Sequence, residues 1–267
     1  MNRFSKGSVI RIASPGHAAF AVMMIALGVL GLIKRDFTVV WQPVPKGAPA
    51  RELLIYLCAL VSMASGLGLL VRRSAALAAG VLLSLLVLWL ALWRVRALFL
   101  ASLVEGTWSF GETLVMIAAA WVLFAWFAAG RGRLDLLTGD KAVRIARALY
   151  GLGLIPFGYA HFAYVKVTAD LVPGWLPWHL GWAYFTGVTF VVAGVSIIIG
   201  VFGRLAAALS TLQMALFFLL VWVPLASTRS LSAFQWDEFV ANLALIAAGW
   251  VVTDSYRSEE RRVGKEC

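Results

Sequence analysis

Residues 160–187, AHFAYVKVTADLVPGWLPWHLGWAYFTG, join two apolar runs through a short segment rich in tryptophan and proline. The chain leaves the first run at His161 and enters the second at Trp182. Pro173 and Pro177 lack the N–H that a continuing helix needs, so the segment between the runs is expected to be a loop. Amphipathic aromatic rings gather where hydrocarbon meets water. The stretch therefore predicts a structured loop at one face of a membrane-embedded helical bundle.

The composition of the whole chain supports this interpretation. Apolar residues make up 62% of 267 positions and charged residues 13%, with a mean hydropathy of +0.88. Soluble domains have roughly 45–50% and 25%, so a soluble globular protein is excluded. Inside lipid a helix satisfies its own backbone, which predicts an all-α polytopic membrane protein with eight transmembrane helices of about 20 residues each. The apolar segments cover residues 14–33, 52–71, 75–93, 112–130, 146–165, 182–202, 204–224 and 238–254.

The net charge of +10 arises from lysines and arginines that lie between the apolar segments. Basic residues in such positions meet anionic lipid headgroups. No basic run is interleaved with aromatic residues, so the expected partner is the lipid bilayer and not nucleic acid. Basic residues are more numerous at the N-terminus and after the second, fourth and sixth segments than after the others. This asymmetry predicts that both termini are cytoplasmic and that residues 166–181 face the outer side.

The two halves of the sequence resemble each other. Several residues recur in the same order at spacings of 128 to 130, which indicates duplication of a four-helix unit. The recurring pairs include Gly28 and Gly158, Thr38 and Thr168, Pro43 and Pro173, Gly66 and Gly194, and Trp108 and Trp236. We therefore expect a first unit over residues 1–130, a cytoplasmic linker over 131–146 and a second unit over 147–256.

The last residues, 257–267, read RSEERRVGKEC. They resemble the in-frame translation of a sequencing adapter, so we expect them to lie outside the fold, with the last apolar helix complete by Tyr256. His17, near the start of the first apolar run, is expected to be a solvated interfacial histidine.

The second half also carries a family resemblance. Its motifs are GYAHF, TADLVPGWLPW and W-x-Y-F-T-G, followed by V-x-A-G-x-S-I-I-I-G-x-x-x-R-L-A-A. Over residues 147–256 this pattern resembles DoxX-like integral membrane proteins. The resemblance implies two tandem DoxX-like four-helix bundles in the inner (plasma) membrane of a bacterium.

The same resemblance implies an accessory membrane subunit of a redox system, which would need a membrane redox partner protein. Such a subunit would have no catalytic activity of its own and would bind a quinone or another lipophilic ligand at the outer face. Wider relatives imply an alternative, a role in membrane assembly or cargo escort. The internal repeat leaves a third class open, a small-solute transporter.

Cysteine and metal chemistry are poorly supported by the sequence. With the tail set aside, Cys58 is the one cysteine, so no C-x-x-C pair exists for thiol–disulfide exchange. Cys58 is expected to be a small packing residue. The three histidines form no H-x-x-x-H or H-E-x-x-H pattern, so no metal site is predicted. No catalytic residue is assigned, and quinone is the only cofactor class that the sequence suggests.

His161 is the principal candidate for binding, because an ionisable side chain in a membrane-spanning segment is a functional hypothesis by default. A neutral imidazole can both donate and accept a hydrogen bond, as proton transfer to a quinone oxygen requires. The alternative is that His161 reaches the interface and hydrogen-bonds the loop. Gly31 stands at the matching position of the first half, so the site is expected in the second half alone. The other candidate ligand-binding residues are Tyr159, Thr168, Asp170, Tyr184, Trp236, Glu238 and Asn242.

Overall fold

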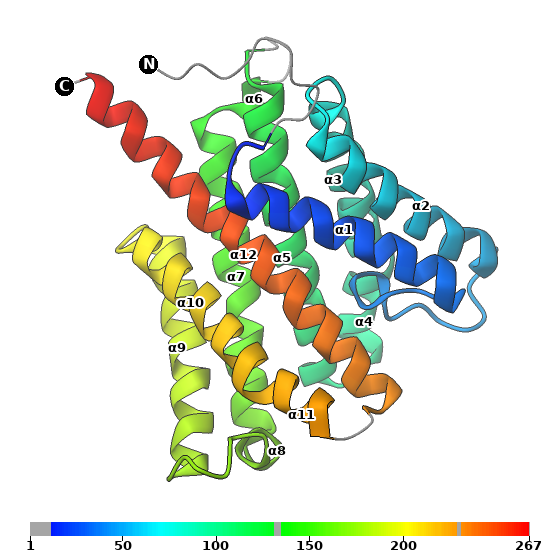
Figure 1. Cartoon of the computed structure of the whole chain (residues 1–267), viewed down its shortest axis with the longest axis vertical. Coiled ribbons are helices and arrows are strands. Elements are labelled where there is room, and N and C mark those ends of the chain that lie inside the picture. Colours follow the sequence, from blue (N-terminus) through cyan, green and yellow to red (C-terminus); the bar gives the residue numbers. More distant parts are fainter. Residues whose placement is uncertain (1–11, 131–134, 229–230, 267) are drawn as a thin grey trace.

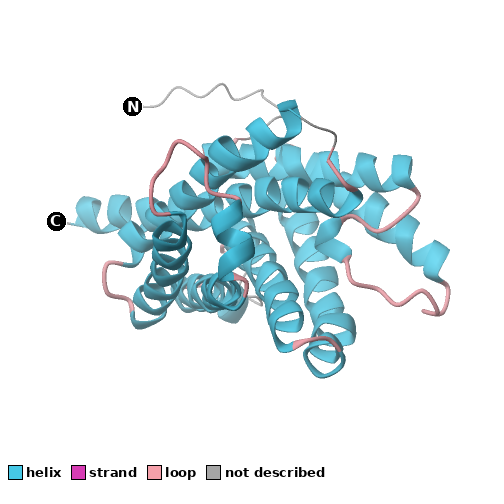
Figure 2. Cartoon of the chain, turned by 90° about the horizontal axis from the view of Figure 1, so that it is seen from below, coloured by secondary structure: helices cyan, strands magenta, loops and turns pink. Residues whose placement is uncertain are grey.

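The structure is a computed structural model that describes residues 12–130, 135–228 and 231–266. Every element in these ranges is a helix, and short loops join the helices (Figures 1 and 2). The first four residues of the expected linker, 131–134, lie outside the described residues, as does Cys267. The rest of that linker is largely helical, because α6 covers Asp135–Thr138 and α7 begins at Asp140.

Seven helical stretches in the described residues are long and apolar enough to cross a membrane, so the protein is a polytopic membrane protein. They are α1 (Pro15–Lys34), α2 (Arg51–Leu70), Ala75–Leu100, α5 (Leu103–Ala128), α9 (His179–Ile199), Gly203–Thr228 and Gln235–Arg257 within α12 (Ala233–Glu266). The eighth expected span lies in α7 (Asp140–Ala163), whose first turns are charged. It is not among the seven, so the eighth span stays a prediction.

Two of the long stretches are built in the same way. Ala75–Leu100 consists of α3 (Ala75–Trp89), the π-helical turn η2 (Leu90–Arg94) and α4 (Val95–Leu100). Gly203–Thr228 consists of α10 (Gly203–Phe217), the π-helical turn η4 (Phe218–Trp222) and α11 (Val223–Thr228). The starting residues 75 and 203, 90 and 218, and 95 and 223 are each 128 apart. The order of the long helices is also the same in both halves.

Glycines let the first two helices of each half cross closely. A Cβ atom on Gly28 of α1 would lie 2.6 Å from the Ala59 carbonyl oxygen of α2. A Cβ atom on Gly158 of α7 would lie 2.5 Å from the Gly187 carbonyl oxygen of α9. Ala59 and Gly187 are themselves 128 residues apart. The backbones therefore touch at corresponding points, as small residues allow in membrane helices.

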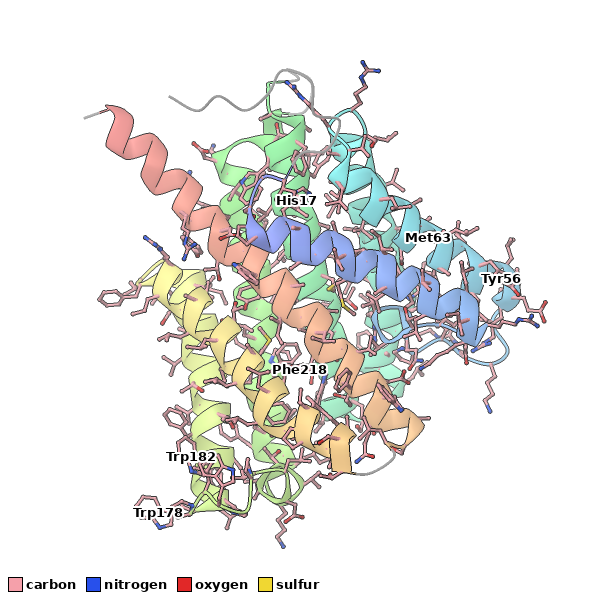
Figure 3. All side chains as sticks on the ribbon, in the orientation of Figure 1. His17, Tyr56, Met63, Trp178, Trp182 and Phe218 are labelled. Carbon is pink, nitrogen blue, oxygen red and sulfur yellow. The ribbon has the colours of Figure 1, made fainter. Side chains whose placement is uncertain are left out.

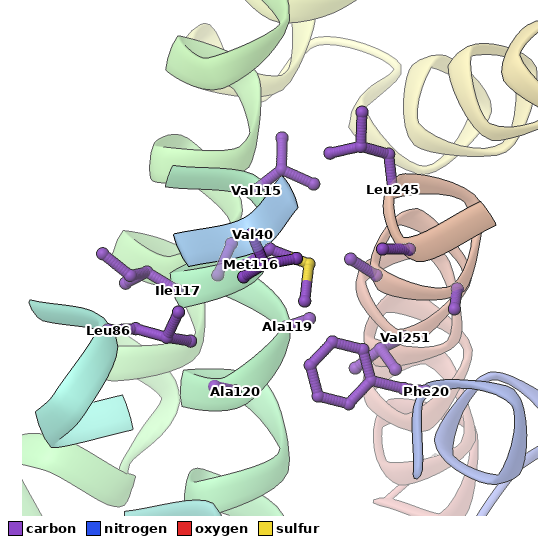
Figure 4. Packing of buried hydrophobic residues seen from close by; sticks show 14 of the residues in the cluster. Phe20, Val40, Leu86, Val115, Met116, Ile117, Ala119, Ala120, Leu245 and Val251 are labelled. Atoms are coloured by element: carbon purple, nitrogen blue, oxygen red, sulfur yellow. The ribbon is translucent and has the colours of Figure 1, made fainter. Parts of the chain in front are cut away.

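The two halves share one core. The first helix of each half packs on the last helix of the other half, α1 on α12 and α7 on α5. The two last helices, α5 and α12, also pack against each other, and α12 crosses the middle of the molecule (Figure 1). Figure 4 shows side chains from α1, α5, α12 and the connection between α1 and α2 that meet in this core. They include Phe20, Val40, Met116, Leu245 and Val251.

The expectation that His17 is solvated is wrong, because its side chain is 0% exposed (Figure 3). Its Nδ1 accepts from the Ala13 N–H at 3.1 Å, and its Nε2 hydrogen-bonds the Leu69 carbonyl oxygen at 3.0 Å. The ring packs on Phe127, with centroids 5.0 Å apart. The cause is the close packing of α1 on α2 and the contact of the His17 ring with Phe127 of α5. His17 thus satisfies the carbonyl at the end of α2.

The last helix does not end at Tyr256, contrary to expectation. α12 continues to Glu266, through most of the segment 257–267. Arginine, glutamate and lysine favour helices, and the first glycine in this segment is Gly264. The exposed Arg257 also pairs with Asp254, with Nη1 and Oδ1 3.8 Å apart.

Candidate functional site

The connection between α1 and α2 folds back into the protein. Its turn η1 (Val39–Trp41) is buried, and Trp41 is only 1% exposed. The Trp41 indole N–H donates to Ser62 Oγ at 3.0 Å, and the Trp89 indole N–H donates to the Trp41 carbonyl oxygen at 2.9 Å. Irregular backbone inside a membrane protein needs partners of this kind, because lipid offers none.

Arg94 also forms hydrogen bonds with the turn η1. It is the last residue of the π-helical turn η2 and is 1% exposed. Its Nη2 donates to the Val39 carbonyl oxygen at 3.4 Å and to the Val40 carbonyl oxygen at 3.1 Å. Its Nε has no hydrogen-bond partner among the described residues. Arg94 therefore carries a positive charge and a free N–H donor inside the protein.

Glu112 of α5 is the carboxylate next to Arg94. The Trp108 indole N–H, one turn earlier on α5, donates to Glu112 Oε1 at 3.0 Å. Glu112 also interacts electrostatically with the Arg94 guanidinium and with the Glu238 carboxylate of α12. The charges thus come from three separate helices that meet where the halves join.

A small, mainly apolar cavity lies beside this cluster. Its lining combines the Glu112 carboxyl group with aliphatic side chains from η1, α5 and α12, namely Val39, Val40, Met116, Ala241, Ala244 and Leu245 (part of this region is shown in Figure 4). Its volume is about 10 Å³, room for about one water molecule, so a larger ligand would have to displace the side chains that line it. The Oδ1 atom of Asn242 is buried nearby on α12 and has no partner among the described residues. An arrangement of apolar walls with a few convergent polar groups is typical of ligand sites.

The predicted site residues fall into two groups. Trp236, Glu238 and Asn242 lie on the first turns of α12, and Glu238 belongs to the cluster around Glu112. Trp236 is 46% exposed and packs on Phe239, with ring centroids 5.3 Å apart. α12 packs on α1, α5 and η1, so this group belongs to the junction between the halves.

The second group lies at the far end of α7, near α8 (Val165–Asp170) and α9. His161 Nδ1 donates to the Phe157 carbonyl oxygen of its own helix at 2.7 Å, and its ring packs on Phe190 of α9 at 5.5 Å. Within the described residues, His161 makes no hydrogen bond to the remaining candidates. Those candidates are Tyr159, half-buried Thr168, exposed Asp170 and Tyr184, which stacks on Phe162. A ligand site at His161 stays a prediction.

Sequence reasoning missed Arg94 and Glu112. The third apolar segment was expected to end at residue 93, whereas the helical stretch continues through the π-helical turn to Leu100. An arginine within a spanning helix is expensive and usually functional, and that is the signal that could have identified Arg94. Glu112 was taken only as the start of the fourth segment, but α5 begins nine residues earlier, at Leu103.

Other chemistry is limited in the described part of the chain. There, no group of three histidine, cysteine, aspartate or glutamate residues could hold a metal ion. Cys58 is buried, as expected for a small packing residue, and its carbonyl oxygen accepts from Ser62 Oγ at 2.7 Å.

No family model matches the sequence, and comparisons with curated proteins and with solved structures returned no match.

Proposed function

We propose that the protein is an accessory protein of the inner membrane that holds a lipophilic ligand where its two halves meet. The observation that carries this proposal is that Glu112, which lines a small cavity with apolar walls, interacts electrostatically with the buried Arg94, whose Nε–H has no partner among the described residues. A buried donor without a partner costs free energy that a bound acceptor would recover. The junction would open around the cavity to admit the ligand, with the aliphatic side chains against a hydrocarbon tail or ring and Glu112 and Arg94 at its polar head.

A quinone is the ligand class that this chemistry favours. A quinone carbonyl can accept from Arg94 Nε, and the hydroxyl of the reduced form can donate to the Glu112 carboxylate. Neither residue suggests electron transfer by the chain itself, so the electrons would come from a membrane redox partner protein. This role agrees with the resemblance to DoxX-like proteins over residues 147–256.

The architecture that goes with this role is a duplicated four-helix unit with eight spans. It is supported by the π-helical turns that recur 128 residues apart and by the matching glycine contacts of α1–α2 and α7–α9. α7 completes the second unit as its first helix and packs between α5 and α9. Eight spans place both termini on one side of the membrane, and the excess of basic residues on that side favours the cytoplasm.

The orientation can be tested with one introduced cysteine at a time in a variant whose Cys267 is replaced by serine and whose buried Cys58 is retained. Gly174→Cys, in the loop before α9, is expected to react with an impermeant thiol reagent added outside intact cells. Gly139→Cys, before α7, is expected to react only after the cells are opened. The opposite pattern would invert the topology, and reaction of both from outside would remove α7 as a span.

Small-solute transport is the second candidate, because Arg94 and Glu112 lie within candidate membrane spans and between repeated halves. Transporters place polar binding groups at the junction of such repeats. Uptake of a solute into sealed vesicles that contain only this protein would favour transport over an accessory role.

The experiment for the proposed function is extraction of bound lipids and quinones from protein purified in a mild detergent. Wild-type protein is expected to carry one quinone or lipid species well above its share of the membrane. Glu112→Gln should lose most of that occupancy while the protein stays folded. Glu105→Gln, the same change in the exposed first turn of α5, is the matched control and should retain it.

Two results would contradict this site. Equal occupancy in wild type and Glu112→Gln would remove the carboxylate from the binding site. Loss of the ligand in His161→Leu but not in Glu112→Gln would place the site at the end of α7 instead.

A further inference from the structure

The first turns of α12 carry two neighbouring carboxyl groups with different surroundings. Asp237 Oδ1 pairs with Lys34 Nζ at 3.3 Å. Glu238 interacts electrostatically with Asp237 and with Glu112, both of which are acidic. Among the described residues it has no ion pair and no hydrogen bond. Glu238 is therefore a half-buried carboxyl group whose nearest charged neighbours repel a negative charge.

Among the described residues, the single cation that interacts with Glu112 is Arg94. Arg94 interacts electrostatically with Glu112, which also accepts the Trp108 indole N–H. Other charged groups at this end are paired or exposed: Asp36 pairs with Arg51 at 2.7 Å, and Glu105 is exposed on the first turn of α5. Arg229 lies outside the described residues, so the experiment below includes an Arg229→Gln variant.

The count of charges leaves one carboxylate in excess. Arg94 balances one of the pair Glu112 and Glu238, and Lys34 balances Asp237. An uncompensated charge away from water is costly, and a carboxyl group avoids this cost by taking up a proton. Since Glu112 has the guanidinium and an indole donor, the proton belongs on Glu238.

An unpartnered acceptor on the same helix supports this assignment independently. Asn242 Oδ1 is buried without a hydrogen-bond donor among the described residues. Asn242 follows Glu238 by four residues, so the two side chains share a face of α12. An ionised carboxylate can only accept, whereas a protonated carboxyl group has an O–H to donate. A proton on Glu238 therefore removes the excess charge and supplies the missing donor.

We propose that Glu238 is a proton-binding site at the junction of the two halves, and that Glu112 controls whether it is occupied. The site does not depend on the proposed ligand, because it follows from the charges of the chain alone. A membrane-embedded carboxyl group that stays protonated near neutral pH is a target for hydrophobic carbodiimides. Glu238 is thus also the expected site of modification by dicyclohexylcarbodiimide.

The modification reports the proton directly. The carboxyl proton moves to a carbodiimide nitrogen, and the carboxylate oxygen adds to the central carbon to give an O-acylisourea. The acyl group then migrates to nitrogen and leaves a stable N-acylurea, with no atom lost. An ionised carboxylate in the membrane has no proton to give and reacts much more slowly.

The experiment treats the full-length protein in membranes with dicyclohexylcarbodiimide at several pH values and locates the adduct by peptide mass spectrometry. In wild type the adduct is expected on Glu238, with labelling that declines as pH rises. Glu238→Gln should abolish it, and Glu105→Gln should leave it unchanged.

Two further variants test the control by Glu112. Glu112→Gln leaves one carboxylate facing one guanidinium, so labelling of Glu238 is expected to fall at least tenfold although Glu238 is still present. Arg94→Gln removes the cation, so labelling should extend to Glu112. Each variant is checked for folding by size-exclusion chromatography in detergent, and either one suffices if the other does not fold.

Several results would overturn the proposal. Absence of an adduct on Glu238 in wild type across the pH range would show that Glu238 is ionised. Labelling of Glu238 that is unchanged in both Glu112→Gln and Arg94→Gln would remove the coupling. An adduct that forms only in Arg229→Gln would identify Arg229 as the counter-ion of Glu238. Loss of the quinone in Glu112→Gln with unchanged Glu238 labelling would leave the proposed function intact and remove this site alone.

Discussion

The connection between α1 and α2 and the connection between α7 and α9 have similar sequences but lie in different environments. The first, between α1 and α2, is drawn into the core, where Thr38 is 3% exposed and Trp41 1%. The second, between α7 and α9, lies on the outside, with Trp175 71% and Trp178 86% exposed (Figure 3 labels Trp178). Both contain the recurring threonine and proline of the repeat. The difference therefore does not lie in those shared residues.

Arg94 provides the physical reason for the difference. It ends the π-helical turn of the first half and donates to the Val39 and Val40 carbonyl oxygens. Trp222 ends the matching turn of the second half, and its indole packs on Phe217 with centroids 6.2 Å apart. A guanidinium has five N–H donors and can satisfy backbone carbonyls that would otherwise be orphaned, whereas an indole has one. Arg94 thus supplies backbone donors to the first connection that Trp222 cannot supply to the second.

The largest expected effect follows from removing that arginine. Arg94→Leu removes the side-chain donor to the Val40 carbonyl oxygen, one of the donors to the Val39 carbonyl oxygen and the cation that interacts with Glu112, which should cost about 3–5 kcal/mol of stability. The expected result is a large fall in the melting temperature in detergent and proteolytic cleavage within residues 35–50. Trp222→Leu is the matched control, because it shortens the corresponding side chain without releasing the first connection. Cleavage of the first connection in both variants would show that Arg94 has no special role.

A smaller effect is expected from the tryptophans of the two connections. Trp41→Phe removes the hydrogen bond to Ser62 Oγ and leaves that buried site less well filled, which should cost about 1–3 kcal/mol. Trp178→Phe changes an exposed ring and should stay within about 0.5 kcal/mol of wild type. Thermal unfolding of both variants in the same detergent provides the comparison. Equal losses would mean that the second connection is also packed against a surface.

A smaller effect than at Trp41 is expected at His161. Its hydrogen bond is to a carbonyl oxygen of its own helix, so His161→Leu should cost about 0.5–1.5 kcal/mol. Ligand occupancy per folded molecule should be unchanged, because the cavity lies beside Glu112. Phe190→Leu, which removes the ring that packs on His161, is the control for lost packing. A fall in occupancy with little change in melting temperature would instead support a site at His161.

The membrane fold was predictable because the length of an apolar helix is set by the thickness of the bilayer. The position of Arg94 was not, because charged residues were taken to mark the ends of spans and a π-helical turn leaves no clear sequence signal. The partners of Arg94 are backbone atoms about fifty residues away in the chain, which the residue types nearby do not reveal. His17 was misjudged for the same reason, since its partner is the carbonyl oxygen of Leu69.

The candidate site was predictable in part. Glu238 and Asn242 were expected on one face of a helix, and both lie on α12 four residues apart, because spacing along a helix determines its faces. Their grouping with His161 was a guess about which helices are neighbours. The structure packs α12 on α5 and α1 instead, so Glu238 faces Glu112. Tertiary neighbours of apolar helices are hard to predict because most of their surfaces are alike.

The most direct test compares thiol reactivity at a buried position of the first connection and an exposed position of the second. Purified variants that lack Cys267 would carry Thr38→Cys in the first connection or Trp175→Cys in the second, and a water-soluble maleimide would measure the rate of labelling. The account predicts rapid labelling at position 175 and almost none at position 38, until Arg94→Leu is added and position 38 becomes reactive. Equal rates at the two positions in the presence of Arg94 would contradict it.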